Sequence, residues 1–375
     1  MNRCRSCVNP DTRPNIFFDE EGICPVCRFE ADKRERAVDW AARDREMHDI
    51  IAWARHKDKK RSAYDCIVTV SGGKDSTRQA FYARDTLGLN PLLVSCVYPP
   101  EQLHERGAVN LANLISHGFD TVSMSLNPQV WKTLMRDSFL KRGNWCVPTE
   151  MALYAIPVHV AIAYQIPLIF LGENPAWTIG EKHGRLDGDA SQMRNCNTLR
   201  GGDASRLAIE GVTPQDLHFY NYPPECDVEH AALRIIYLGY YIRDWSGTNN
   251  AAFSQARGLV VRTDPPEKTG DLWGFSSLDE DFRLVNQMVK FAKFGFGHVT
   301  DQACEAINAG TMTREEGLEL VRRFDGRCAP EYIRRYCDYL GITEAKFWEV
   351  VERFRDKELV EHDGAGGLRL RKDLA

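Results

Sequence analysis

The 375-residue chain lacks a strong excess of charge of either sign, since 48 lysines and arginines stand against 53 aspartates and glutamates. Nucleic-acid-binding proteins usually carry a basic footprint, so a formal net charge of −5 argues against a polyanionic macromolecular partner. Long apolar runs are also missing: the longest, such as residues 92–97 and 167–171, are far too short to cross a bilayer. The first residues are polar and include a cysteine, unlike a secretory signal sequence. We therefore expect a cytoplasmic protein that binds neither nucleic acid nor a membrane.

Cysteine, by contrast, is abundant. Twelve cysteines without an export signal indicate reduced thiols and bound metal rather than disulfides. Four of them form two Cys-x-x-Cys pairs separated by sixteen residues, a pattern that places four thiolates tetrahedrally around a structural Zn²⁺. An iron–sulfur cluster is the alternative, because four cysteines can also hold one, but two paired arms favour zinc. The predicted zinc ligands are Cys4, Cys7, Cys24 and Cys27.

The run Ser-Gly-Gly-Lys-Asp-Ser at residues 71–76 is the strongest sign of a functional site. It follows a β-branched apolar stretch over 66–70 that predicts a buried strand, and it precedes a helical pattern over 77–87. A glycine turn at a helix N-terminus binds anions, because glycine lets backbone N–H groups approach phosphate and the helix dipole favours negative charge. It is not a Walker A loop, since G-x-x-x-x-G-K-[ST] is absent. The alternative is an ordinary glycine turn that caps a helix.

Each side chain of this run has a predicted role. Lys74 can neutralise phosphate oxygens, and Asp75 can hold a Mg²⁺ ion that bridges them. The predicted phosphate ligands are Ser71, Gly72, Gly73, Lys74, Asp75 and Ser76.

Apolar strands alternate with helical segments beyond this run. The expected strands cover 66–70, 91–97, 120–125 and 166–171, and the expected helices between them cover 105–117, 127–142 and 150–164. This order predicts βαβ units and an α/β fold with a parallel sheet. Ligands of such sheets bind at the carboxyl ends of strands, where Glu173 follows the strand at 166–171. Glu173 is therefore a candidate second Mg²⁺ ligand or substrate-orienting carboxylate, and a surface acid is the alternative.

The rest of the chain divides by composition. We predict a zinc-binding unit at 1–30, a helical linker at 31–62, a catalytic domain at 63–260 and a mostly helical region at 261–375. Within them, a helix is expected to lead from Glu229 into an aromatic run, and the tail beyond His362 is expected to be loosely ordered. Cys146 has no evident activating partner in the sequence, so an inert thiol is favoured over a nucleophile.

Further short runs accompany these motifs: residues 10–14 and 19–24 beside the Cys-x-x-Cys pairs, and residues 171–175, 237–245, 293–297 and 310–316. Together with the run at 71–76, they resemble the bacterial N-acetyl sugar amidotransferases of the PP-loop ATP pyrophosphatase superfamily. Two departures from the family pattern concern His298, where an arginine is frequent, and the order of Asp244 and Trp245.

The resemblance implies a PP-loop (adenine nucleotide alpha hydrolase-like) domain with an N-terminal zinc knuckle and a helical C-terminal lobe. It also implies a reaction. ATP would adenylate the acetamido carbonyl of an activated, nucleotide-linked N-acetyl sugar, and ammonia would then replace the oxygen. The products would be AMP, PPi and an acetamidino sugar for lipopolysaccharide O-antigen or a related surface glycan. Lys74, Asp75 and Glu173 would be the catalytic residues, with ATP, Mg²⁺ and structural Zn²⁺ as cofactors.

The source of ammonia lies outside this sequence. It contains neither a nucleophilic cysteine in a recognisable elbow nor an N-terminal catalytic cysteine, so no glutaminase site is evident. The family resemblance implies glutaminase and cyclase-like partner proteins that supply ammonia.

Two other functions are compatible with parts of the pattern. PP-loop tRNA thiolases also combine the phosphate loop with Cys-x-x-Cys knuckles, but the acidic composition and the lack of a further Cys-x-x-Cys argue against this function. A non-enzymatic zinc and ATP scaffold is the other alternative, and the intact Lys74-Asp75 pair argues against it.

Overall fold

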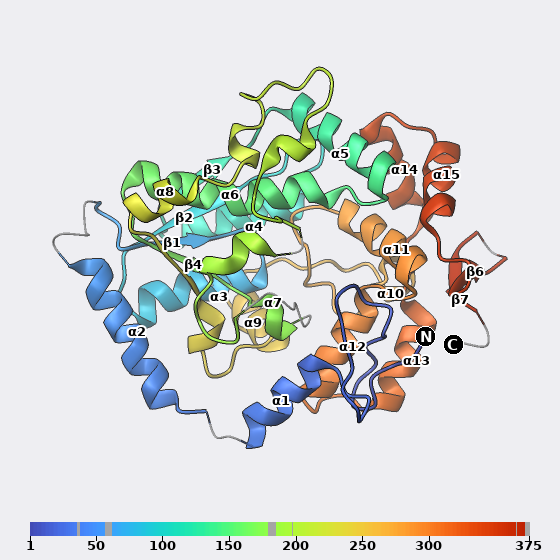
Figure 1. Ribbon diagram of the computed structural model, residues 1–375, viewed down its shortest axis with the longest axis horizontal. Helices are drawn as coiled ribbons and strands as arrows, with labels where there is room; N and C mark the ends of the chain where they lie inside the picture. The colour runs from blue at the N-terminus through green and yellow to red at the C-terminus, as the bar shows by residue number, and fades with distance from the viewer. Residues whose placement is uncertain (36–37, 57–61, 179–184, 197, 365, 372–375) are drawn as a thin grey trace.

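The computed structural model describes the chain except for residues 36–37, 57–61, 179–184, 197, 365 and 372–375. One half of the molecule is built around a five-stranded parallel sheet in the order β3-β2-β1-β4-β5 (Figure 1). In register, Val68 of β1 pairs with Leu93 of β2 and Phe170 of β4. The strands are β1 (Cys66–Thr69), β2 (Pro91–Cys96), β3 (Thr121–Met124), β4 (Leu168–Leu171) and β5 (Arg234–Tyr237). The predicted α/β fold with a parallel sheet is confirmed.

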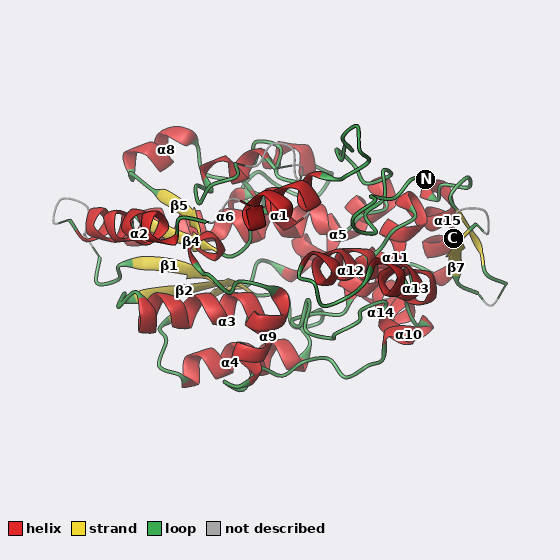
Figure 2. Cartoon of the chain, turned by 90° about the horizontal axis from the view of Figure 1, so that it is seen from below, coloured by secondary structure: helices red, strands yellow, loops and turns green. Residues whose placement is uncertain are grey.

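Both faces of the sheet are covered by helices, which explains why the central strands are continuous apolar runs. Alternate residues of β1 belong to different cores: Ile67 packs with α5 and α6, and Val68 packs with α3 and α4. Figure 2 shows these helix pairs on opposite sides of the sheet. The helices are α3 (Lys74–Phe81), α4 (Glu105–Ser116), α5 (Pro128–Arg142) and α6 (Cys146–Tyr164), with a π-helical turn at Tyr82–Thr86 after α3.

Helix α6 is long and apolar enough to cross a membrane, and it is the one such helix in the described part of the chain. Counting uninterrupted apolar runs did not reveal it, because Glu150 and His159 break the apolar sequence. Its most apolar window is 61% buried inside the protein, and it packs against α5 and β2. This is the burial of a core helix.

One prediction in the middle of the chain is wrong. Instead of a helix that runs from Glu229 toward the aromatic run, α8 (Glu225–His230) ends early and β5 follows it. β5 joins the sheet beside β4, with Ile236 opposite Phe170. Its four residues are too few to show a period, and the β-branched Ile235 and Ile236 are both buried, one on each face. Long-range pairing with β4 therefore makes this segment a strand.

The cysteine-rich N-terminus and the C-terminal helices pack onto this α/β layer. The cysteine unit shares a small core with Val299 of α12 and Val321 of α13. Helices α11, α14 and α15 share the main core with α5 and α6. The N-terminal helices are α1 (Pro25–Glu35) and α2 (Trp40–Arg55). The later helices are α7 (Pro175–Thr178), α9 (Gly247–Gln255), α10 (Pro266–Thr269), α11 (Phe282–Phe294), α12 (His298–Asn308), α13 (Arg314–Phe324), α14 (Pro330–Leu340) and α15 (Glu344–Phe354). Short 3₁₀ segments cover Ser191–Asn195, Ala204–Leu207, His218–Tyr220 and Leu238–Tyr241.

The prediction of a loosely ordered tail beyond His362 is also wrong for the described residues. β7 (Leu368–Leu370) pairs antiparallel with β6 (Val360–His362). Leu368 and Leu370 are buried in the main core, so apolar packing stabilises this hairpin. The glycine-rich sequence around them does not indicate this packing. The end of this predicted segment, residues 372–375, lies outside the described residues.

Candidate active site

The Ser-Gly-Gly turn follows the carboxyl end of β1, and α3 begins immediately after it at Lys74. The strand order reverses between β1 and β4, and such a switch point is where parallel sheets bind ligands. Gly72 has φ of +78°, and a Cβ on it would lie 3.0 Å from the backbone N of Leu111, so the turn requires glycine there. Gly73 precedes the first turn of α3 in an extended conformation. The first N–H groups of α3 thus lie beside the turn, in the arrangement of an anion site.

Lys74 and Asp75 form an ion pair, with Nζ 2.5 Å from Oδ2. Helix α9 fixes both residues: Asn250 donates to Oδ1 of Asp75 at 2.7 Å, and Ser254 donates to the backbone oxygen of Lys74 at 2.8 Å. Burial lowers the pKa of Lys74, but the carboxylates of Asp75 and Glu173 outweigh it and raise this pKa above its usual value. The lysine is therefore a fixed cation at neutral pH.

Glu173 lies at the carboxyl end of β4, on the other side of the switch point. Glu173 lines the cavity and is accessible from it, yet the protein packed around its carboxyl group limits hydration. This desolvation, reinforced by the carboxylate of Asp75, raises the pKa of Glu173 to about 7, and Lys74 opposes the shift. The structure thus brings Lys74, Asp75 and Glu173 to one place, as the sequence predicted, and their catalytic roles remain predictions.

These groups line a cavity of about 540 Å³. The phosphate loop forms one wall. The other walls come from segments that the sequence assigned to separate units, namely α1, the segment 273–278 and α12. Residues of α12 that line it are spaced three or four apart, so they share one helix face. These residues are His298, Asp301, Gln302, Glu305 and Asn308, and Cys304 at the edge of this face also lines the cavity.

Several of these contributors have no signal in the sequence. Asn250 is fully buried beside Asp75 although it lies 175 residues further along the chain. Glu305 accepts a hydrogen bond from the backbone N–H of Gly247 at 2.7 Å and adds negative charge near Lys74. No spacing rule connects positions so far apart, so only the folded chain reveals them.

The two departures from the family pattern lie in different surroundings. His298 lines the cavity, and burial lowers its pKa to about 4 despite the carboxylates of Asp271 and Asp301. The imidazole is therefore neutral at pH 7. Asp244 is a half-exposed partner of Arg78, at 2.8 Å, and belongs to the surface rather than to the cavity lining.

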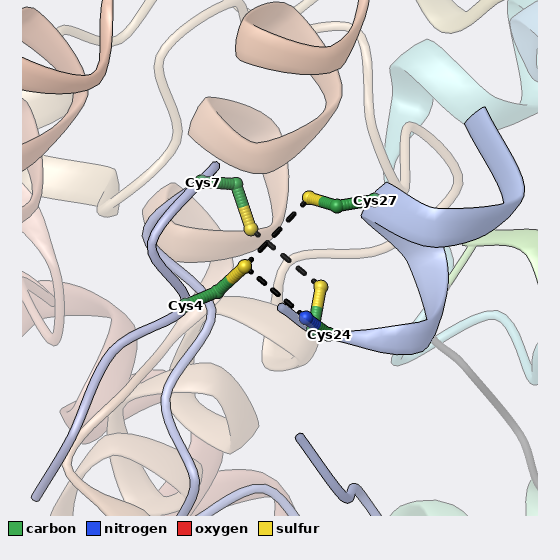
Figure 3. Close-up of side chains that lie close together, drawn as sticks. All are labelled: Cys4, Cys7, Cys24 and Cys27. Atoms are coloured by element: carbon green, nitrogen blue, oxygen red, sulfur yellow. Dashed lines mark hydrogen bonds between the residues drawn. The ribbon is translucent and has the colours of Figure 1, made fainter. Parts of the chain in front are cut away.

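The four paired cysteines converge as predicted (Figure 3). Their sulfur atoms are buried and lie within 4.8 Å of one another, and the two diagonal contacts, Cys4–Cys27 and Cys7–Cys24, measure 3.9 and 3.8 Å. A tetrahedral ion with metal–sulfur bonds of about 2.3 Å places its sulfurs about 3.8 Å apart. The residues therefore fit a single four-coordinate metal ion. Cys27 also contacts Asn308 of α12 at 3.3 Å, so this site adjoins the cavity wall.

Cys146 is buried in the main core, and burial raises its pKa well above that of an ordinary thiol. A thiol in this state is a poor nucleophile, which agrees with the interpretation from the sequence.

Glu280, next to the cavity segment, offers a test of the buried electrostatics. It is 1% exposed, and burial, reinforced by the carboxylates of Asp279 and Asp281, raises its pKa to about 8. The folded state therefore holds more protons than the unfolded state between about pH 5 and about pH 8, so wild-type stability should fall over this range relative to Glu280→Gln. The slope can reach about 1.4 kcal/mol per pH unit. Urea unfolding of both proteins at several pH values measures it. Glu358→Gln, at an exposed carboxylate, serves as the control, and parallel curves for wild type and Glu280→Gln would contradict the assignment.

The fold and the loop define a doubly wound α/β protein with a glycine turn and a helix N-terminus at its switch point. Residues 274–369 match the family model described as "LPS biosynthesis protein WbpG-like, C-terminal domain". The chain therefore carries a WbpG-like C-terminal domain, which includes the runs at 293–297 and 310–316, and this match agrees with the family resemblance seen in the sequence.

Among curated proteins, none matches this chain. Among solved structures, the chain is similar to NMN synthetase from Francisella tularensis, at 13% identity and a TM-score of 0.27, over 59% of this chain and 98% of that one. It is also similar to the U34-tRNA thiolase NcsA from Methanococcus maripaludis with its [4Fe-4S] cluster, at 15% identity and a TM-score of 0.25, over 68% of this chain and 82% of that one.

Proposed function

We propose that this chain is an ATP-dependent amidotransferase of lipopolysaccharide biosynthesis, which converts the acetamido group of a nucleotide-linked N-acetyl sugar to an acetamidino group. One observation carries the proposal. The Lys74–Asp75 pair and Glu173 meet in a cavity that residues of the WbpG-like domain also line. That match supports a sugar substrate over the tRNA of the alternative function. The proposal implies a cytoplasmic enzyme, because its ATP is a cytoplasmic substrate.

The chemistry needs a group that activates an amide. An amide oxygen is a poor leaving group, so it must first attack the α-phosphorus of ATP, which gives an O-adenylyl imidate and PPi. Ammonia then adds to the imidate carbon, and AMP leaves with the former amide oxygen. The loop at 71–76 would hold the departing pyrophosphate through its N–H groups, and Lys74 would neutralise the developing charge.

The residues present fit a magnesium ion. Burial, and after it the carboxylate of Asp75, raises the pKa of Glu173, so the two carboxylates repel each other in a way that a divalent cation relieves. Asp75 and Glu173 would hold Mg²⁺, which when bound neutralises phosphate charge. The cysteine cluster would hold Zn²⁺ in a structural role, because it joins α1 to α12, two walls of the cavity.

A direct assay tests the proposal. The purified chain is incubated with ATP, Mg²⁺, ammonium and a panel of nucleotide-linked N-acetyl sugars. We expect AMP, PPi and a sugar nucleotide that is lighter by the difference between O and NH in mass spectrometry. ADP and inorganic phosphate as the nucleotide products would overturn the mechanism.

A second assay concerns the source of ammonia. Because the sequence has no glutaminase signature, the isolated chain should form no amidine from glutamine alone. It should form amidine slowly with concentrated ammonium at alkaline pH, where more of the free base is present. Adding glutaminase and cyclase-like partner proteins should restore glutamine-dependent turnover. Amidine formation by the isolated chain with glutamine alone, with stoichiometric release of glutamate, would disprove the partner proposal.

A further inference from the structure

The segment 273–278 forms the wall of the cavity beside the phosphate loop. Trp273 and Phe275 line the cavity with their rings stacked, 5.3 Å between centroids and 21° between planes. Nζ of Lys74 lies 5.5 Å from the centroid of Phe275. We call Trp273, Phe275, Ser276 and Ser277 the aromatic wall. A ligand packed on it is adjacent to whatever Lys74 binds.

A buried arginine holds the aromatic wall rigid. The backbone N–H of Arg262 donates to the oxygen of Gly274 at 2.8 Å, and its guanidinium donates to the backbone oxygens of Ser276 and Ser277 at 3.2 and 3.0 Å. Arg262 is 4% exposed, and its charge is balanced by Asp271 and Asp281. Ser277 has φ of +47°, a left-handed conformation that a non-glycine residue adopts only where its surroundings impose it. Strained backbone held by a buried polar group is typical of a preorganised binding segment.

Arg283 supplies a second cation to the same cavity. It lines the cavity, and no described residue forms a hydrogen bond or ion pair with its guanidinium, although Glu150 and Glu280 lie near enough to interact with its charge. The other cavity arginines are engaged: Arg43 donates to the oxygen of Tyr240 at 2.7 Å, and Arg243 pairs with Asp44 at 3.0 Å. A cavity guanidinium whose N–H groups have no hydrogen-bonded acceptor favours an anionic ligand, because it binds phosphate oxygens in pairs.

Two anionic substrates in one cavity need two cations. The proposed reaction brings ATP phosphates to Lys74, and the acetamido oxygen must reach the α-phosphorus from beside them. The aromatic wall occupies this place, with Phe275 next to Lys74. Aromatic faces pack well on the apolar face of a sugar ring. The second cation is then available for the phosphate that carries the sugar.

On the basis of the proposed function, we propose that the aromatic wall and Arg283 form the acceptor subsite, and that the acceptor is a phosphate-linked sugar. Arg283 pairs with its phosphate, and the stacked rings of Trp273 and Phe275 pack on its sugar ring. Phe275 and Arg283 lie within the WbpG-like match at 274–369 and Trp273 directly precedes it, so this part of the chain selects the acceptor, and the loop at 71–76 binds ATP.

Calorimetric binding tests this subsite without catalysis. The probes are a panel of UDP-linked N-acetyl sugars, the corresponding free N-acetyl sugars, and a non-hydrolysable ATP analogue. Arg283→Gln should lower the affinity for the best-bound UDP-linked sugar by about tenfold to a hundredfold, which is the range for a lost charge-assisted contact. Affinity for the free sugar and for the ATP analogue should change by less than about twofold, and Arg283→Lys should recover part of the loss. Trp273→Ala should lower the affinity for the UDP-linked sugar and for the free sugar alike.

The controls separate the possible failures. Arg369→Gln, at an exposed arginine of β7, should bind every probe as the wild type does, and thermal unfolding should show that each variant is folded. If Arg283→Gln lost affinity for the ATP analogue and for the UDP-linked sugar equally, the assignment would be overturned, because Arg283 would then bind ATP. Unchanged binding in Arg283→Gln, or no binding of any UDP-linked sugar by the wild type, would also overturn it. Arg283-dependent binding without amidine formation would support the subsite and refute the proposed reaction.

Discussion

Asp75→Asn should reduce the rate of ATP cleavage between the α and β phosphates by about a hundredfold to a thousandfold, the loss typical of removing one electrostatic contact to a transition state. The carboxylate orients Nζ of Lys74 at 2.5 Å, and asparagine keeps the shape but loses the charge. The same change removes one proposed ligand of Mg²⁺. Release of AMP and PPi, measured by chromatography with labelled ATP, reports the effect.

A matched control lies on the π-helical turn that continues α3. Asp85 is half-exposed and pairs with Arg84, away from the cavity lining, so Asp85→Asn should cleave ATP at the wild-type rate. The circular dichroism and unfolding midpoint of Asp75→Asn should match those of this control, because Asn250 can still contact the new amide. Wild-type rates of AMP release by a folded Asp75→Asn protein would remove Asp75 from the mechanism.

Replacing one of the four cysteine ligands should cause a large loss of bound metal and of stability. The purified protein should contain about one zinc per chain, and Cys24→Ser should lose it. Apparent binding free energies of structural zinc are about 10–16 kcal/mol, so the variant should lose at least a few kcal/mol of stability in the N-terminal unit. The loss should extend to the C-terminal helices, because Arg314 donates to the backbone oxygens of Cys4 and Cys7 at 3.2 and 3.1 Å.

Elemental analysis measures the metal, and hydrogen exchange measures where protection is lost. Protection should fall in α12 and α13, which share a core with the cysteine unit, and persist in the strands of the sheet. Cys226→Ser is the matched control, since this cysteine is exposed and distant in sequence from the four ligands. A brown protein that contains iron and sulfide would show that the four cysteines hold an iron–sulfur cluster instead of zinc. A metal-free protein with full stability would refute the metal site.

The cavity shows why the site could be predicted only in part. The loop at 71–76, Glu173 and the cysteine pairs are local signals: a glycine turn between strand and helix, an acid at a strand end, and a fixed spacing of thiols. Their convergence followed from the rule that carboxyl ends of parallel strands share one edge of the sheet. By contrast, Asn250 and Arg283 are single residues on helices whose own sequences carry no such signal.

By itself, the sequence determined the alternating α/β architecture, the phosphate loop and the four-thiolate cluster, because each depends on residues within one short segment or on a repeated apolar period. The tertiary structure alone decided the fifth strand, the β6–β7 hairpin and the cavity walls built from α1, the aromatic wall and α12. These features arise from pairing and packing between segments far apart in the chain. Their stability comes from apolar surface buried between partners and from clamps such as Arg262, and neither is encoded in the spacing of neighbouring residues.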